Sequence, residues 1–153
     1  MARKKNLRKM ALSISGKHIT ASADETSKLG EIFANVLKPA DVVFLKGELG
    51  SGKTTFVKGA ARGAKVNALV RSSSFILVSE YSGKKFNIYH IDLYRLKGNS
   101  DFENLGLEEY LFGSGVSFVE WADKISGFPV SRGYEIDFKW LSENKRQISI
   151  EQL

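Results

Sequence analysis

Short apolar segments with two different periodicities divide this chain into strands and helices. Apolar residues alternate with polar ones, or run together, over seven segments that we predict to be strands: residues 11–15, 41–45, 76–81, 86–94, 116–121, 134–138 and 147–151. Helical spacing predicts helices over residues 22–37, 54–62 and 100–112, with one helical turn at 122–125. Some strands follow helices and others are joined by short polar turns. The pattern therefore predicts α/β architecture in a single domain, with a mixed parallel and antiparallel sheet flanked by helices.

The first of these helices carries its own start and stop signals. Ser22 and Glu25 have the spacing of a capping box, in which each side chain satisfies a backbone amide at the start of the helix. Pro39 follows the last apolar residue and cannot continue a helix.

A glycine-rich turn follows the strand at 41–45. Residues 47–55, with the sequence GELGSGKTT, match the P-loop pattern G-x-x-x-x-G-K-[ST] at every fixed position. Backbone amides in such a turn converge on phosphate oxygens at a helix N-terminus, where the helix dipole favours negative charge. We expect Lys53 to face solvent and reach the β- and γ-phosphates of a nucleotide, and the Thr54 hydroxyl to ligate Mg²⁺. The alternative is a strand-to-helix turn that binds nothing, but the complete match and its context favour phosphate binding.

A P-loop also needs a carboxylate for the metal, typically at the end of a hydrophobic strand. Asp92 follows the apolar segment 88–91, and Glu120 follows the segment 116–119. The alternatives are a surface acid paired with Arg95 in the case of Asp92, and an acid that starts a helix in the case of Glu120. Because a P-loop creates a specific need for such a group, we favour a metal-side role for both.

Two neighbours of these carboxylates each fit two roles. Period-two alternation places His90 on the same strand face as Asp92, where it would be either a structural hydrogen-bonding residue or a catalyst. Trp121 follows Glu120 directly, and it would either stack on a base or fill the core. From the residue type alone, we favour the role in which Trp121 fills the core.

The charge of the chain is concentrated at its start. Of the formal net charge of +6, five units come from Arg3, Lys4, Lys5, Arg8 and Lys9. We therefore predict a basic, disordered N-terminal arm over residues 1–10 and a P-loop domain over residues 11–153. Such an arm is commonly a solvated leader. Alternatively, it contacts RNA or an acidic partner through counterion release.

The composition also bears on the cellular compartment. Cysteine is absent, which excludes disulfides and thiolate metal sites and favours a reducing compartment. No run approaches the ~20 apolar residues that span a bilayer, and the basic start lacks the apolar segment of a secretory signal. We therefore expect a cytoplasmic protein that does not associate with a membrane.

Four motifs occur in a fixed order along the chain: the P-loop, Ser72-Ser73-Ser74-Phe75, His90-Ile91-Asp92-Leu93-Tyr94-Arg95 and Val119-Glu120-Trp121. The P-loop alone is shared by many folds, whereas His-x-Asp-x-Tyr-Arg followed by Glu-Trp is far more particular. In this combination the chain resembles the TsaE family, small bacterial P-loop ATPases of tRNA threonylcarbamoyladenosine biosynthesis. The resemblance extends from about Ser22 to the C-terminus and leaves the basic arm outside it.

The resemblance implies a role for each site residue. Asp92 resembles the family's essential acid near the γ-phosphate, and Glu120 resembles its second metal-side carboxylate. The implied catalytic residues are Lys53, Asp92 and Glu120, and the implied metal ligands are Thr54, Asp92 and Glu120. The implied ATP-binding residues are Thr26, Glu48, Leu49, Gly50, Ser51, Gly52, Lys53, Thr54, Thr55 and Trp121. Thr26 would lie near the adenine, and a residue near Lys145 and Arg146 would also approach the nucleotide.

One loop departs from the family pattern. Residues 72–75 correspond to a switch-like segment that usually reads Ser-Pro-Thr-Phe or Ser-Pro-Thr-Tyr. Here Ser73 replaces the proline, and Ser74 replaces the threonine but keeps a hydroxyl. Because the rigid φ of proline is lost, we expect a more mobile loop.

The resemblance also implies a function. It suggests a Mg²⁺-dependent ATP-binding and ATP-hydrolysing component of the machinery that makes N6-threonylcarbamoyladenosine at position 37 of tRNA. The implied partners are TsaB and TsaD. TsaD transfers the group, and the ATPase supports turnover of the TsaB–TsaD complex. Any contact with tRNA would be at most indirect or, judging from the charge of the chain's start, made through the basic arm.

Two other functions are compatible with a P-loop. A small-molecule kinase is disfavoured by the short chain and by the lack of an arginine-rich lid segment after the P-loop. A nucleotide-gated assembly module with incidental hydrolysis would use the same residues as an ATPase. No arginine finger has a fixed place beside the P-loop, although Arg71 and Arg95 are candidates. We therefore expect weak hydrolysis by the chain alone and activation by partners.

Overall fold

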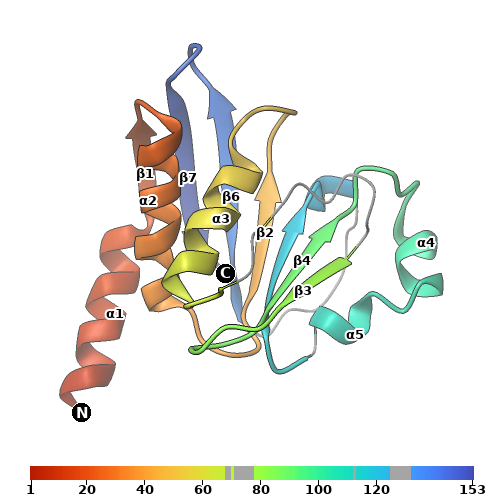
Figure 1. Ribbon diagram of the computed structural model, residues 1–153, viewed down its shortest axis with the longest axis horizontal. Helices are drawn as coiled ribbons and strands as arrows, with labels where there is room; N and C mark the ends of the chain where they lie inside the picture. Colours follow the sequence, from red (N-terminus) through yellow and green to blue (C-terminus); the bar gives the residue numbers. More distant parts are fainter. Residues whose placement is uncertain (68–69, 71–77, 112, 125–131) are drawn as a thin grey trace.

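The computed structural model describes residues 1–67, 70, 78–111, 113–124 and 132–153. Its strands form one seven-stranded sheet, with the longer helices gathered beside the sheet (Figure 1). This arrangement confirms the predicted α/β architecture with a mixed sheet.

The helices and strands have well-defined bounds. The α-helices are α1 (Ala2–Ile14), α2 (Ala23–Phe33), α3 (Lys53–Gly63), α4 (Asn99–Asn104) and α5 (Glu108–Leu111), and the 3-10 helices are η1 (Ala34–Val36) and η2 (Ala122–Lys124). The strands are β1 (Gly16–Thr20), β2 (Val42–Lys46), β3 (Val78–Tyr81), β4 (Ile88–Asp92), β5 (Val116–Glu120), β6 (Gly133–Trp140) and β7 (Arg146–Gln152). Within the part of the chain that the structure describes, no helix is long and apolar enough to cross a membrane.

The centre of the sheet is parallel and its edges are antiparallel. The strand order is β1-β7-β6-β2-β5-β4-β3, in which β2 is parallel to both β5 and β6, and β4 is parallel to β5. The carboxyl ends of parallel strands meet at one edge of a sheet, so the ends of β2, β5 and β4 lie together. The register is specific: Glu120 lies opposite Leu45 on one side and Asp92 on the other. The P-loop and both candidate carboxylates therefore emerge at the same edge.

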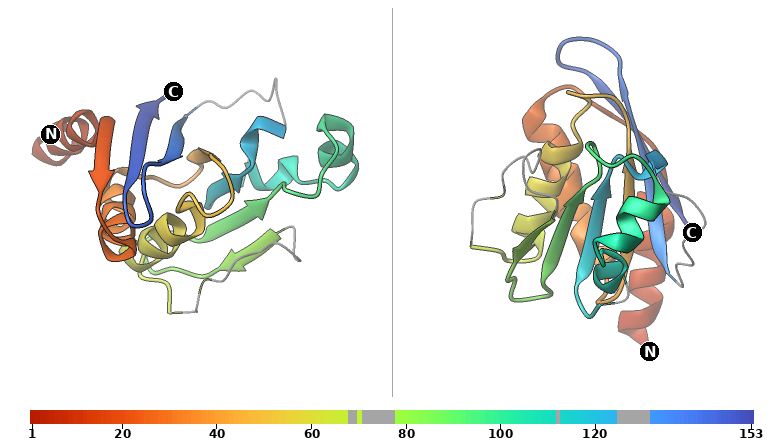
Figure 2. Two further views of the ribbon diagram at one scale, coloured as in Figure 1. Left: turned by 90° about the horizontal axis from the view of Figure 1, so that it is seen from above. Right: turned by 90° about the vertical axis from the view of Figure 1, so that its right-hand side faces the viewer.

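The two faces of the sheet are covered by different helices. One cluster of buried residues packs α2, α3 and η1 onto one face, and a second packs α4, α5 and η2 onto the other (Figure 2). Close contact between α2 and α3 depends on two glycines. A Cβ at Gly59 would lie 1.8 Å from the carbonyl oxygen of Ser27, and one at Gly30 would lie 2.1 Å from that of Phe56. Any side chain at these positions would separate the helices and shift the N-terminus of α2 relative to the P-loop helix.

The start of the chain differs from the prediction. Residues 2–14 form helix α1, where we predicted a disordered arm followed by a strand at 11–15. The first strand is β1 (Gly16–Thr20), which pairs with β7. Lysine, arginine, leucine, methionine and alanine all have high helix propensity, and this outweighs the short alternating pattern.

Other elements are close to the prediction. The capping box of α2 is present: the amide of Glu25 donates to Oγ of Ser22 at 3.1 Å, while the Glu25 carboxylate accepts from the amide of Ala21 at 2.6 Å. The predicted helix at 100–112 is instead two short helices, α4 and α5. Gly106, with φ +66°, interrupts the helix between them. Residues 76–77 of a predicted strand lie outside the described residues.

Candidate functional site

The P-loop connects β2 to α3 and has the backbone geometry that its glycines allow. Gly47, Gly50 and Gly52 have φ values of +145°, +77° and +105°. Gly52 is the N-cap of α3, so the loop ends directly at the positive end of that helix. A Cβ at Gly47 would lie 2.7 Å from the carbonyl oxygen of Phe138, so the loop passes too close to β6 for any side chain. The turn is therefore shaped as the sequence predicted.

Lys53 lies inside the loop and does not face solvent, contrary to our expectation. Its side chain is 5% exposed. Nζ donates to the carbonyl oxygens of Gly47 at 2.6 Å and Glu48 at 2.8 Å, and lies 4.4 Å from the centroid of the Trp121 ring. The charge is buried because loop carbonyls and the electron-rich face of an indole replace water around it. These acceptors hold the ammonium at the place where phosphate oxygens would bind.

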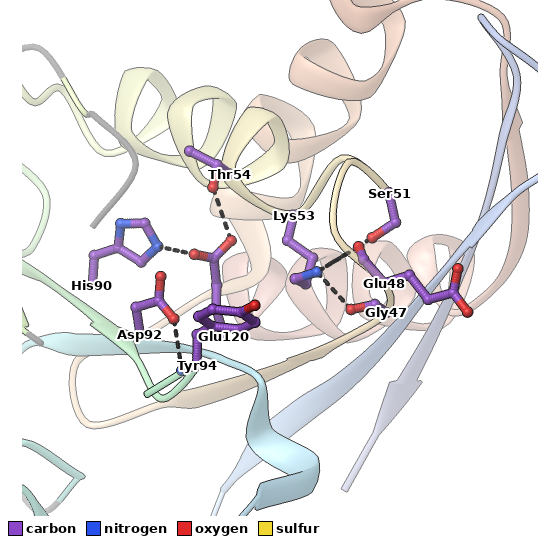
Figure 3. A network of polar contacts seen from close by, with 9 residues as sticks. All are labelled: Gly47, Glu48, Ser51, Lys53, Thr54, His90, Asp92, Tyr94 and Glu120. Carbon is purple, nitrogen blue, oxygen red and sulfur yellow. Dashed lines mark hydrogen bonds and ion pairs between the residues drawn. The ribbon is translucent and has the colours of Figure 1, made fainter. Parts of the chain in front are cut away.

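Glu120 is held between the P-loop helix and strand β4 (Figure 3). The hydroxyl of Thr54 donates to Oε1 at 3.0 Å, and Nε2 of His90 donates to Oε2 at 3.0 Å. Glu120 is 2% exposed and His90 is fully buried. Nδ1 of His90 has no hydrogen-bond partner among the described residues. Both oxygens of the buried carboxylate are thus oriented by Thr54 and His90, which argues against the alternative in which Glu120 serves to start a helix.

The surroundings of Glu120 favour its ionised form. Burial is the largest single influence on the pKa of this carboxyl and would raise it. The hydrogen bond and charge of His90, the Thr54 hydroxyl and the charge of Lys53 together outweigh burial, so the pKa lies below its ordinary value. An ionised carboxylate beside a P-loop hydroxyl is a donor set suited to Mg²⁺.

Asp92 lies beside Glu120 on the neighbouring strand but has different surroundings. Oδ1 of Asp92 accepts a hydrogen bond from the amide of Tyr94 at 2.9 Å. Asp92 is 6% exposed. Burial, together with the nearby charge of Glu120, raises the pKa of Asp92, despite the opposing effects of the Tyr94 amide, His90 and Lys53. Burial also excludes the alternative in which Asp92 is a surface acid.

Trp121 has an unusual backbone conformation. Its φ is +59°, a left-handed value that is uncommon for a bulky residue and costs of order 1–3 kcal/mol. The ring lies 5.0 Å from the ring of Tyr94 and beneath Nζ of Lys53. Trp121 is half-buried, packs partly against the second core cluster and also lines the cavity at the P-loop. The indole therefore fills part of the core and also faces the cavity.

A cavity of about 520 Å³ joins these elements, and most of the predicted nucleotide-binding residues line it. They are Thr26, Leu49, Gly50, Gly52, Lys53, Thr54, Thr55 and Trp121, and the predicted metal-side residues Asp92 and Glu120 line it as well. Glu48 and Ser51 do not line the cavity, but both provide oxygen atoms close to Nζ of Lys53. Thr26 reaches the cavity from the first turn of α2, where its hydroxyl lies 2.7 Å from that of Thr20. Residues far apart in the sequence thus converge on one site.

The cavity also has lining residues that the sequence did not indicate as binding residues: Ser22, Ala23, Tyr94, Glu143 and Asn144. Arg146 and Arg95 line it as well. Arg146 fixes the β6–β7 hairpin to the P-loop, since its guanidinium donates to the carbonyl oxygens of Gly50 at 3.1 Å and Ser142 at 2.7 Å. No sequence motif marks this hairpin, and only the loose resemblance near Lys145 and Arg146 pointed to it.

The donor set fits a magnesium ion of the kind that P-loop sites bind. Among the described residues, no group of three or more histidine, cysteine, aspartate or glutamate side chains could hold a metal. Mg²⁺ does not require such a group, because it usually keeps several waters and uses one or two carboxylates together with substrate phosphates. Thr54, Glu120 and Asp92 at one edge of the sheet could provide that partial shell. Arg71 and the switch-like loop at residues 72–75 lie outside the described residues.

Comparison with known proteins identifies similar chains. Residues 20–148 match the family model described as threonylcarbamoyl adenosine biosynthesis protein TsaE. The chain is 41% identical over 134 residues to the tRNA threonylcarbamoyladenosine biosynthesis protein TsaE of Aquifex aeolicus, with 86% of this chain and 92% of that protein covered. It is 38% identical over 130 residues to the protein of that name from Bacillus subtilis, with 85% and 81% covered. Among solved structures, the crystal structure of Bacillus subtilis YdiB has a TM-score of 0.71 and 34% identity, with 88% of this chain and 82% of that chain covered.

Proposed function

The chain belongs to the TsaE family of threonylcarbamoyladenosine biosynthesis, and from this membership we propose that it is a Mg²⁺-dependent ATP-binding and ATP-hydrolysing protein. It acts in the cytoplasm in the formation of N6-threonylcarbamoyladenosine at position 37 of tRNA. Its partners are TsaB and TsaD, and it supports turnover of that complex without transferring the group itself. The family model covers the P-loop, both carboxylates and Trp121.

The observation that best supports this proposal is the hydrogen bond between Thr54 and Glu120. It joins the hydroxyl position of a P-loop to a buried, ionised carboxylate at the end of the neighbouring strand. In P-loop NTPases the loop hydroxyl and a strand-end carboxylate together hold Mg²⁺. A cavity of about 520 Å³ opens beside this pair, within the range of small-molecule sites.

Each residue would contribute through its own chemistry. The amides of the P-loop and the N-terminus of α3 would bind phosphate oxygens, and Lys53 would exchange its carbonyl acceptors for the β- and γ-phosphates. Thr54 and Glu120 would hold the metal, which neutralises charge developing on the phosphates. Asp92, with its raised pKa, would lie near the γ-phosphate and hold a proton more readily than an ordinary aspartate. Trp121, Tyr94 and Thr26 would enclose the nucleoside.

Weak activity without partners is part of the proposal. Arg95 and Arg146 line the cavity, but Arg146 already binds the carbonyl oxygens of the P-loop and of its own hairpin. A P-loop enzyme that lacks charge stabilisation in the transition state loses on the order of 10³–10⁵ in rate, and a partner can provide that charge in trans. We therefore place TsaB and TsaD at the open side of the cavity.

Two measurements test the proposal. The first is binding of ATP and ADP to the purified chain with and without Mg²⁺, for which we expect saturable binding that Mg²⁺ strengthens. The second is phosphate release in the presence of TsaB and TsaD. An absence of nucleotide binding would overturn the whole proposal. Normal binding with no hydrolysis under any combination of partners would instead favour the nucleotide-gated assembly module.

A further inference from the structure

Helix α1 is a strongly cationic element outside the nucleotide site. Residues 1–23 contain the cations Arg3, Lys4, Lys5, Arg8, Lys9 and Lys17, and the first acidic residue of the chain is Asp24. The family model begins at residue 20, and the first residue lining the cavity is Ser22. The function proposed above therefore assigns no role to this helix.

The helix is attached to the domain at its C-terminal end. Ile14 is buried in the main core cluster, and the carbonyl oxygen of Ile14 accepts a hydrogen bond from Nε2 of His18 at 2.6 Å. The helix contacts η1, and from there it leads away from the sheet, so that the N-terminus lies at its far end (Figures 1 and 2). Such an attachment fixes the base of the helix, while residues 1–6 and Lys9 are exposed and accessible to a partner.

The charged side chains are exposed on the part of the helix that extends from the domain. Arg3, Lys4, Lys5 and Lys9 are all exposed. Nine residues separate Lys5 from Ile14, about two and a half turns at 3.6 residues per turn, so the two lie on opposite sides of the helix. Lys9 lies one turn from Lys5 on the same side. Lys5 and Lys9 therefore lie on the side away from the core, and Lys4, about 100° further round the helix, widens this exposed cationic surface.

We propose that α1 binds the phosphate backbone of a structured RNA, namely the tRNA on which this family's pathway acts. A surface of exposed lysines with no intervening acid matches a chain of phosphates, and binding would be driven by release of condensed counterions. The contacts would be to phosphates and would carry no base specificity. The helix would thus add affinity for the substrate of the complex without contributing to the nucleotide site.

A membrane surface fits the helix less well. A helix that lies on a bilayer turns its apolar side into the lipid. In α1 that side includes Ile14, which is buried in the protein core. The choice of tRNA as the partner rests on the proposed function, because it follows from membership of the TsaE family. The exposed cationic surface of α1 does not depend on that function.

The test compares two variants of equal charge. In the first, Lys4→Gln, Lys5→Gln and Lys9→Gln remove three charges from α1 while keeping good helix formers. In the matched control, Lys28→Gln, Lys58→Gln and Lys84→Gln remove three charges from exposed positions elsewhere. Affinity of the full-length chain for an unmodified tRNA transcript is measured from 50 to 300 mM salt. Binding to vesicles that contain phosphatidylserine and binding of ATP are measured in parallel.

We expect the α1 variant to reduce the magnitude of the slope of log K against log salt by about 2–3, close to one for each phosphate that is no longer neutralised. Its binding to tRNA should weaken at least tenfold at ~100 mM salt. The control variant should bind tRNA as the unmodified chain does, and both variants should bind ATP normally. Equal losses in the two variants would overturn the proposal, since net charge alone would then explain binding. Unchanged tRNA affinity in the α1 variant would also overturn it, as would loss of vesicle binding without loss of tRNA binding. Because ATP binding is measured on the same proteins, failure of this inference is distinguishable from failure of the proposed function.

Discussion

Thr54 and Glu120 are 66 residues apart in the sequence, yet the hydroxyl of Thr54 donates a hydrogen bond to Oε1 of Glu120 at 3.0 Å. The contact joins the first turn of α3 to the end of β5, and His90 holds the other carboxylate oxygen from β4. Parallel pairing of β2, β5 and β4 brings these three groups to one edge of the sheet. The sheet thereby brings the candidate metal ligands Thr54 and Glu120 together.

Replacing Lys53 should disable the site while leaving the fold intact. We expect Lys53→Ala to reduce ATP hydrolysis with partners by about 10²–10³, because a positioned charge for the phosphates is lost. The variant also loses the hydrogen bonds to Gly47 and Glu48, so a modest fall in melting temperature is expected. Lys58→Ala is the matched control, because Lys58 is an exposed lysine of the same helix. Equal hydrolysis rates in the two variants would count against the P-loop assignment.

Asp92→Asn should separate stability from activity. Because the folded-state pKa of Asp92 is raised above 3.8, the contribution of this carboxyl to stability is present at low pH and is lost as the pH rises through the folded pKa. Asparagine keeps the acceptor for the Tyr94 amide and removes the buried charge. We therefore expect a higher melting temperature at pH 7, by roughly 2–4 °C for each kcal/mol gained, and no gain below about pH 3.8, measured by calorimetry.

The same variant should lose hydrolysis. We expect Asp92→Asn to retain ATP binding but to hydrolyse about 100-fold more slowly with TsaB and TsaD. A variant that is both less stable at pH 7 and fully active would contradict the role proposed for Asp92.

Glu120→Gln should act mainly through the metal. The amide keeps the size of the side chain but removes the charge that attracts Mg²⁺, so we expect the Mg²⁺ concentration for half-maximal ATP binding to rise by about tenfold or more. Affinity for ATP without Mg²⁺ should stay the same or improve, because a negative charge near the phosphates is lost. Thr54→Ala should also raise the Mg²⁺ requirement, while Thr54→Ser should preserve it. An unchanged Mg²⁺ titration in Glu120→Gln would refute the metal-side assignment.

His90 should act as a positioning residue through Glu120. Its hydrogen bond and charge favour the ionised carboxylate, so His90→Ala should raise the pKa of Glu120. The acid limb of the Mg²⁺-dependent activity should then move to higher pH, and the Mg²⁺ requirement should rise by about 10- to 100-fold. His18→Ala, at the only other histidine, is the control and should leave both readouts unchanged. A purely structural role would lower the melting temperature without moving the acid limb.

The parts of the site that could be predicted from the sequence are those encoded in short segments. The P-loop is a contiguous motif, and Asp92 and Glu120 each end an apolar run that predicts a strand, although only the structure shows that these two strands are adjacent. The fold class followed in the same way, because strand periodicity and polar turns are local properties.

The remaining parts depend on contacts between distant segments. The Arg146 contact with Gly50 joins the β6–β7 hairpin to the P-loop, and no local pattern specifies it. Burial of Lys53 depends on loop carbonyls and on the left-handed backbone at Trp121, which places the indole beneath the ammonium. Helix α1 was missed because its charge pattern is equally typical of a solvated leader, whereas burial of Ile14 against the domain fixes its end.

Partner-dependent ATP turnover tests the central claim most directly. Phosphate release is measured for the purified chain alone, for TsaB and TsaD alone, and for all three together, with Lys53→Ala in place of the unmodified chain as the blank. We expect slow turnover by the chain alone and an increase of about 10³-fold or more when both partners are added, with no such increase in the Lys53→Ala mixture. Turnover that is the same with and without partners, or that persists with Lys53→Ala, would contradict the account.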